Sequence, residues 1–191
     1  MTMDEQKAIQ RLKQGDVGGL ELLVSRYQVR AVRVAYLITR DPGLAEDIVQ
    51  DCFLQVYRSI HRFDGTRPFE PWFMRSVVNA AVKILQRSAR QVPIDADGAS
   101  AEALFADLAA QVESVEEQVE SVEIQDRIWG AMQKLSPRQR AVIVQRYFLD
   151  MSEKEMAEAA GSAVGTVKWM LNAARSRLRG LLGDSHRRSE P

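Results

Sequence analysis

The sequence predicts an all-α protein: two small helical domains joined by an acidic linker, with a helix-turn-helix in the second domain. Apolar residues recur at helical spacing, and no stretch of the 191 residues sustains the alternation of a strand. Helix start and stop signals are frequent. Charge divides the chain. Residues 1–90 hold 14 Lys or Arg and 10 Asp or Glu, residues 91–126 hold 10 acids and no base, and residues 127–191 hold 12 bases and 6 acids.

Start and stop signals place the main helices. Asp41-Pro42 predicts an N-cap with proline at the first helical position, opening a helix that runs to about Ile60. Capping boxes are predicted at Ser136-Pro137-Arg138-Gln139 and at Ser152-Glu153-Lys154-Glu155. Gly161 then predicts a helix end. These signals divide both halves of the chain into short helices.

The linker contains a seven-residue repeat, "QVESVEE" followed by "QVESVEI" at 111–124. Its valines lie 3 and 4 apart and share one helical stripe, which predicts a marginal acidic helix within a flexible tether. We therefore expect domains at 1–90 and 127–183, a linker at 91–126 and a disordered tail at 184–191. Two basic blocks around an acidic one favour lobes that bind a polyanion, although solvated helix faces would carry similar charges.

Other classes of protein lack support. Cys52 is the single cysteine, which excludes an internal disulfide and a cysteine-based zinc cluster. His61 and His186 are the only histidines and lie far apart in sequence, and no metal-ligand cluster or phosphate loop is present. The N-terminus has no apolar core of a signal peptide, and no apolar run is long enough for a membrane helix. We expect a soluble cytoplasmic protein, not an enzyme, without metal or cofactor.

The C-terminal lobe has the spacing of a helix-turn-helix. With Ala157 at the fifth position, Gly161 falls in the turn and Val167 at the fifteenth, where the second helix packs on the first. The predicted buried stripe is Val164, Val167, Leu171, Ala174 and Leu178, and the predicted outward stripe is Lys168, Asn172, Arg175 and Arg179. Thr166 and Lys168 lie in the first turns, the part of a recognition helix that enters the major groove. An ordinary helical hairpin is the alternative.

The N-terminal lobe combines aromatic and basic residues in "RFDGTRPFEPWFMRSVVNAAVKILQR" at 62–87, a turn-rich loop that leads into a helix. Phe63, Phe69, Trp72 and Phe73 lie close to Arg62, Arg67 and Arg75, and the helix carries a polar-basic stripe of Arg75, Asn79, Lys83, Arg87 and Arg90. Rings that stack on bases and cations that follow phosphates suit a single-strand binder. The aromatics can equally form core, and for Phe63 and Phe73 we favour that interpretation.

The preceding helix should bury Ile48, Cys52, Val56 and Ile60, and should leave acids beside an apolar side chain on its other faces. The residues concerned are Asp47, Gln50, Asp51 and Leu54. Such a patch suits a protein partner, and a solvated face explains it equally well.

Two long segments resemble a known family. "AEDIVQDCFLQVYRSIHRFDG…PFEPWFMRSVVNAA" and "LSPRQRAVIVQRYFLDMSEKEMAEAAGSAVGTVK" are similar to the two domains of bacterial RNA polymerase sigma factors of the extracytoplasmic-function group, and "QGDVGGLELLVSRY" resembles the first helices of the same N-terminal domain. The resemblance covers about 10–88 and 124–182, with the domains in the family's order.

The resemblance implies roles for these residues. Asp47, Gln50, Asp51 and Leu54 would bind the clamp helices of core polymerase. Asn79 falls on the family's base-contacting asparagine, and the first domain would melt the minus-10 element and hold a flipped base. The DNA-binding candidates are Phe63, Arg67, Trp72, Arg75, Asn79 and Lys83 for single-stranded minus-10 DNA, and Thr166, Lys168, Trp169, Asn172 and Arg175 for the minus-35 duplex. The second domain would also rest on the polymerase flap.

The resemblance further implies that the acidic linker lies in the RNA path of polymerase and that an anti-sigma factor controls the protein. One segment departs from the family: after "VGTVK" the family is usually basic and polar, whereas this chain has Trp169, Met170, Asn172 and Ala173. We expect fewer cationic contacts and an altered minus-35 preference. A helix-turn-helix regulator that acts without polymerase and a protein-interaction module remain the alternatives.

Overall fold

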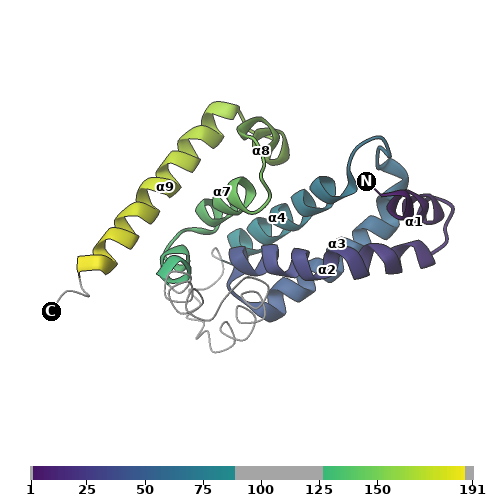
Figure 1. Cartoon of the computed structure of the whole chain (residues 1–191), viewed down its shortest axis with the longest axis horizontal. Helices are drawn as coiled ribbons and strands as arrows, with labels where there is room; N and C mark the ends of the chain where they lie inside the picture. Colours follow the sequence, from purple (N-terminus) through teal and green to yellow (C-terminus); the bar gives the residue numbers. More distant parts are fainter. Residues whose placement is uncertain (1, 89–126, 188–191) are drawn as a thin grey trace, which may run out of the picture. The chain divides into compact units, whose positions relative to one another are not determined.

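The structure is a computed structural model that describes residues 2–88 and 127–187. The chain divides into two units, Met1–Gln91 and Val92–Pro191. All regular elements in these described ranges are helices, which confirms the all-α prediction (Figure 1). The predicted linker at 91–126, with its valine heptads, lies outside the described residues.

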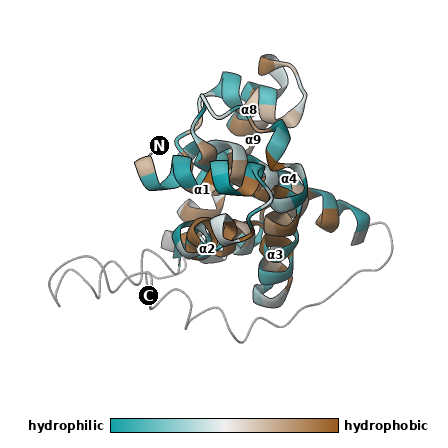
Figure 2. Cartoon of the chain, turned by 90° about the vertical axis from the view of Figure 1, so that its right-hand side faces the viewer, coloured by the Kyte–Doolittle hydropathy of each residue, from teal (hydrophilic) through white to brown (hydrophobic). Residues whose placement is uncertain are grey.

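The first unit is a helical bundle built around its second helix. Its elements are α1 (Met3–Lys13), α2 (Gly18–Thr39), α3 (Pro42–Ser59), the short 3-10 helix η1 (Ile60–Arg62) and α4 (Phe69–Ser88). Helix α2 packs against α1, α3 and α4. Figure 2 shows hydrophobic and hydrophilic segments alternating along these helices, as one-sided burial requires. The largest fully buried side chains of the unit include Leu23, Ile38, Ile48, Phe69 and Phe73.

Helix α3 begins where the sequence predicts. The Asp41 side chain accepts a hydrogen bond from the Leu44 N–H at 3.0 Å, and Pro42 occupies the first helical position. The predicted inner face, comprising Ile48, Cys52, Val56 and Ile60, is buried. Because that face is fixed in the core, the opposite face of α3 is held toward solvent.

Glycine at position 19 allows α1 to lie directly against α2. A Cβ atom at Gly19 would collide with the Ala8 carbonyl oxygen and lie 3.0 Å from Leu12 Cγ. The obstacle at Ala8 is backbone and cannot rotate away. Ala8, Ile9 and Leu12 of α1 are buried in this contact.

We expect Gly19→Ala to destabilise the chain by roughly 1–3 kcal/mol, the cost of overpacking a close contact. Urea denaturation followed by circular dichroism measures the loss. The control is Gly43→Ala in α3, where the nearest atom to a new Cβ is Asp41 Oδ1 at 3.6 Å. That variant should unfold at the wild-type urea concentration or slightly above it. Equal stability of the two variants would contradict the close-contact explanation.

The second unit contains helical residues 127–133, then α7 (Pro137–Tyr147), α8 (Glu153–Ala160) and α9 (Val164–Arg187). Both predicted capping boxes are present, at Ser136 with Gln139 and at Ser152 with Glu155. Gly161 ends α8 in the left-handed conformation at φ 59°, as predicted. Helix α9 packs against α7 and α8.

Two predictions for α9 are wrong. Val164 is 44 % exposed instead of buried, because as the first residue of the helix it has no preceding helical turn beside it. The helix also continues to Arg187, whereas the sequence predicted disorder from residue 184. A glycine such as Gly183 costs a helix only about 1 kcal/mol and does not end it without a capping conformation. The remaining tail, residues 188–191, lies outside the described residues.

Candidate nucleic-acid and polymerase interfaces

The loop between η1 and α4 is ordered by its own hydrogen bonds. Asp64 Oδ1 accepts from the Thr66 N–H at 3.0 Å and from the Thr66 hydroxyl at 2.7 Å. These bonds lower the pKa of the Asp64 carboxyl. The Arg67 N–H donates to the Asp64 carbonyl at 3.0 Å, and Arg67 Nε lies 3.5 Å from Asp64 Oδ2. The loop therefore presents the exposed Arg67 guanidinium from a defined backbone.

The aromatic residues beside this loop fall into two groups. The first group is buried and comprises Phe63, Phe69 and Phe73. The ring centroid of Phe69 lies 5.6 Å from that of Phe63 and 5.7 Å from that of Phe73. Phe63 is only 3 % exposed, so its ring belongs to the core, and its assignment as a DNA contact is not supported. Trp72 is half-buried, with its ring 5.0 Å from that of Phe63. Of the two aromatic contacts predicted for this unit, Phe63 and Trp72, only Trp72 is partly accessible.

Helix α4 presents its polar stripe to solvent. Arg75, Asn79 and Lys83 are exposed at one-turn spacing, whereas Val77, Val78 and Ala81 between them are buried. The predicted orientation of the stripe is thus observed. Arg87 continues it, and Arg90 lies outside the described residues. An exposed amide between two cations can meet a base edge while its neighbours meet phosphates.

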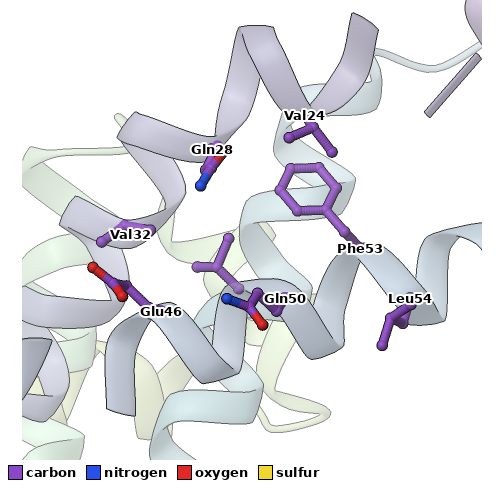
Figure 3. Close-up of a pocket in the computed structure, with 8 residues that line it drawn as sticks. Val24, Gln28, Val32, Glu46, Gln50, Phe53 and Leu54 are labelled. Carbon is purple, nitrogen blue, oxygen red and sulfur yellow. The ribbon is translucent and has the colours of Figure 1, made fainter. Parts of the chain in front are cut away.

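Helix α3 presents the predicted acidic patch beside a groove. Asp47, Gln50, Asp51 and Leu54 are all exposed, in the order that the sequence predicted. A groove of about 300 Å³ lies between α2 and α3 and is lined by Val24, Gln28, Val32, Glu46, Val49, Gln50, Phe53 and Leu54. Figure 3 shows the Phe53 ring of α3 directed toward Val24 of α2 and Glu46 near Val32, whereas the Leu54 side chain points away from α2.

Sequence reasoning missed this groove, since it depends on which α2 residues face α3. The valines at 24 and 32 carried no signal beyond helical spacing. Apolar and polar side chains both line the groove, a mixture that protein-docking surfaces share.

The helix-turn-helix of the second unit has the predicted geometry. Ala157 and Val167 are buried, and the turn between their helices passes through Gly161. Leu171 and Ala174 complete the inner stripe, with Leu178 half-buried. The outer surface of α9 is therefore fixed relative to α8.

That outer surface carries the predicted contacts. Thr166, Lys168 and Asn172 are exposed, and the Trp169 side chain is 71 % exposed. Arg175 is held in place instead of extending freely: its Nε donates to the Tyr147 hydroxyl at 2.8 Å, with its guanidinium 5.6 Å from the ring centre. Tyr147, at the end of α7, was not predicted, because nothing in the sequence relates it to a residue 28 positions away.

The described residues offer little for metal or thiol chemistry. Within residues 2–88 and 127–187, no group of three or more His, Cys, Asp or Glu side chains could hold a metal ion. Burial raises the pKa of the Cys52 thiol to about 11, which keeps it protonated at neutral pH. Over the same ranges, no helix is long and apolar enough to span a membrane.

The second unit has a helix-turn-helix with an exposed polar face, and the first unit has a basic stripe on α4; together they indicate a nucleic-acid-binding protein. The family model of sigma-70 region 2 matches residues 23–91, and that of sigma-70 region 4 matches residues 125–178. The chain is 30% identical to the ECF RNA polymerase sigma factor SigW of Bacillus subtilis, over 96% of this chain and 100% of the relative. It is 31% identical to the ECF sigma-E factor of Haemophilus influenzae, covering 91% of this chain and 92% of the relative.

The fold agrees. The sigma factor RpoE of Bartonella quintana, solved with the anti-sigma factor NepR, is similar with a TM-score of 0.64 and 21% identity over 85% of this chain and 96% of that one. CnrH, solved with the cytosolic domain of CnrY, is similar with a TM-score of 0.60 and 22% identity, over 95% of this chain and 98% of that one. The chain belongs to the ECF sigma factors of bacterial RNA polymerase.

Members of this family are non-catalytic transcription initiation factors, and the chain directs RNA polymerase to promoters. A regulator consisting of a helix-turn-helix alone accounts for residues 127–183 and leaves the match at 23–91 unexplained. Because both units match sigma-70 family models, neither this regulator nor a protein-interaction module accounts for the whole chain.

Proposed function

We propose that the two units divide promoter recognition between them. In the first unit, the exposed α3 residues bind core RNA polymerase, and the α2–α3 groove extends that contact. These residues are Asp47, Gln50, Asp51 and Leu54.

The ordered loop and α4 capture single-stranded minus-10 DNA. Arg67, Arg75 and Lys83 contact phosphates, Trp72 lies against a base, and Asn79 binds a base edge. In the second unit, Thr166, Lys168, Trp169, Asn172 and Arg175 of α9 contact the minus-35 duplex. Residues 1–90 and 127–183 would then be the functional domains.

The observation that carries this proposal is the exposed stripe of Arg75, Asn79 and Lys83 on α4, beside a loop with a defined backbone. Cations track phosphates without regard to sequence, while an amide can distinguish one base from another. A stripe that combines both can melt and recognise DNA in one step, because a flipped base exposes the edge that the duplex hides.

We further propose control by an anti-sigma factor and location with the polymerase in the cytoplasm. Two chains of similar fold were solved with partners, one described as the anti-sigma factor NepR and the other as the cytosolic domain of CnrY. The acidic segment at 91–126 would occupy the RNA path, where its ten carboxylates suit positively charged walls. No metal or cofactor is needed for any of these steps.

The proposal is tested by reconstitution with bacterial core polymerase on a library of promoter fragments randomised in the minus-35 and minus-10 segments. The holoenzyme should enrich one sequence in each segment, and core polymerase alone should enrich neither. Enrichment at minus-35 only would remove the minus-10 role from α4. Enrichment that does not require polymerase would favour a free-standing regulator.

Trp169 should determine part of the minus-35 preference. Its exposed indole lies on the face that carries Lys168 and Asn172, where an apolar group can contact a thymine methyl. We expect Trp169→Ala to reduce discrimination at one thymine about fivefold, the lower end of a specific base contact. The salt dependence of binding should not change.

Uracil substitution isolates the methyl group in this test. Replacing that thymine by uracil in the enriched duplex should weaken the wild type and leave Trp169→Ala unaffected. Lys168→Gln is the comparison: it should weaken all sequences and reduce the log–log salt slope by about 0.9. If uracil weakens both proteins equally, Trp169 does not contact the methyl.

A further inference from the structure

Helix α1 precedes the segment matched by the region 2 family model, which begins at residue 23, and yet it is rigidly attached to the rest of the first unit. Thr2 and Glu5 form a capping box at its N-terminus. At its other end, Arg11 Nε donates to Asp16 Oδ2 at 2.7 Å, and Asp16 Oδ1 accepts from the Gly18 N–H at 2.8 Å. With the close approach at Gly19, these contacts fix where the last turn of α1 lies.

The last residue of that turn, Lys13, reaches the loop before α4. Its Nζ donates a hydrogen bond to the Phe63 carbonyl oxygen at 2.8 Å, across 50 residues of sequence. The Phe63 ring is buried against Phe69 and Trp72. The Phe63 peptide is thus held from two sides, by its ring in the core and by the ammonium group at its carbonyl.

The turn of the loop follows directly after the Phe63 peptide, so the position of this peptide fixes where the turn begins. Asp64 follows immediately, and its side chain and carbonyl form the turn that brings Thr66 and Arg67 into position. Lys13 also lies beside this turn, since a Cβ added at Gly65 would be 3.9 Å from its Nζ. A shift of the Phe63 carbonyl would therefore move the Asp64 turn and redirect the Arg67 guanidinium.

We propose that Lys13 is a positioning residue for minus-10 recognition: by hydrogen-bonding the Phe63 carbonyl, it sets the shape of the loop that, with Trp72 and Asn79, holds the captured base. The inference rests on the proposed function, and it assigns to α1 a part in DNA recognition. Lys13 acts through the peptide at Phe63 and not by contacting DNA. Its loss should therefore reduce base discrimination, which a phosphate contact would not do.

The experiment compares Lys13→Met, Lys13→Arg and Lys7→Met holoenzymes on promoter fragments randomised at minus-10. Methionine keeps an unbranched chain but cannot donate, arginine restores a donor, and Lys7 is an exposed lysine of the same helix that provides an equal change in charge. We expect the enrichment of the preferred minus-10 sequence to fall about tenfold in Lys13→Met, the scale of one hydrogen bond from a charged donor. Lys13→Arg should recover most of it, and Lys7→Met should match the wild type.

Two further measurements separate positioning from other roles. Core polymerase binding of Lys13→Met should stay at the wild-type value, and its melting temperature should fall only by the amount that one lost hydrogen bond costs, because the buried residues of α1 are unchanged. A weakening that is equal for all minus-10 sequences, with a smaller salt slope, would make Lys13 a phosphate contact and overturn the proposal. Undiminished enrichment in Lys13→Met would also overturn it. If the wild type itself shows no minus-10 preference, the proposed function fails first.

Discussion

Replacing Asp47 and Asp51 by lysine is expected to abolish binding to bacterial core RNA polymerase. Both carboxylates are exposed on the face of α3 opposite its buried residues, and Gln50 between them lines the α2–α3 groove. The double substitution changes the charge of this face by four units. Basic groups of the polymerase that would pair with these carboxylates would then face lysines of the same charge. Binding should weaken at least about 100-fold.

The fold should tolerate this change. The inner face of α3 is formed by Ile48, Cys52 and Val56, none of which is altered. Substitutions at exposed helix positions usually change stability by less than about 0.5 kcal/mol. Circular dichroism and thermal melting of the variant should therefore match the wild type.

Binding is measured with tagged protein and purified core polymerase at moderate salt. Asp47→Asn/Asp51→Asn should be intermediate, since neutral residues lose attraction without adding repulsion. Asp4→Lys/Glu21→Lys, which has the same net charge change on α1 and α2, is the matched control and should bind normally once its melting temperature is confirmed. Wild-type affinity in the α3 double lysine variant would remove this face from the interface.

The elements that the sequence predicted well are those with local causes. The start of α3 depends on Asp41 and Pro42, which are adjacent, and the capping boxes at Ser136 and Ser152 span four residues each. The helix-turn-helix depends on positions within about a dozen residues around Gly161. Short-range chemistry of this kind is visible in a single sequence.

The features that the sequence did not predict depend on tertiary packing. Lys13 meets the Phe63 carbonyl across 50 residues, and Arg175 meets Tyr147 across 28. Val164 satisfied the helical period of the buried stripe, yet it is 44 % exposed at the first position of α9, whereas Val167 one turn later is buried. The helical period gives the face of a residue, and only the position of the other helices decides whether that face is covered. For the same reason, the sequence alone is compatible with Phe63 either in the core or in contact with DNA. In the structure its side chain is buried in the core.

Substituting Asn79 should eliminate recognition of one minus-10 base. Asn79 is exposed between Arg75 and Lys83 on α4, and its amide offers a donor and an acceptor to a single base edge. In Asn79→Ala holoenzyme, discrimination at one position of the randomised minus-10 segment should fall roughly 5- to 150-fold, which corresponds to about 1–3 kcal/mol for a good bidentate contact. The other positions should keep their preferences.

The neighbouring cations provide the contrast. Arg75→Ala and Lys83→Ala should weaken binding to every minus-10 sequence by a similar factor and should each reduce the salt slope by about 0.7 on single-stranded DNA. Thermal melting of all three variants checks that α4 keeps its packing. A loss in Asn79→Ala that is uniform over sequences would show that the asparagine supports binding without recognising a base.

A promoter that is already open distinguishes recognition of the base from melting of the duplex. On a fragment with mismatched minus-10 strands, the energy of unpairing no longer has to be supplied by the protein. If Asn79 holds the flipped base, Asn79→Ala should still fail to discriminate on this fragment, because the missing contact is to the base itself. If its role is to start melting, the mismatch should restore wild-type discrimination and binding. We expect the first outcome, since the amide lies on the exposed face of a helix whose opposite side is fixed in the core by Val77, Val78 and Ala81.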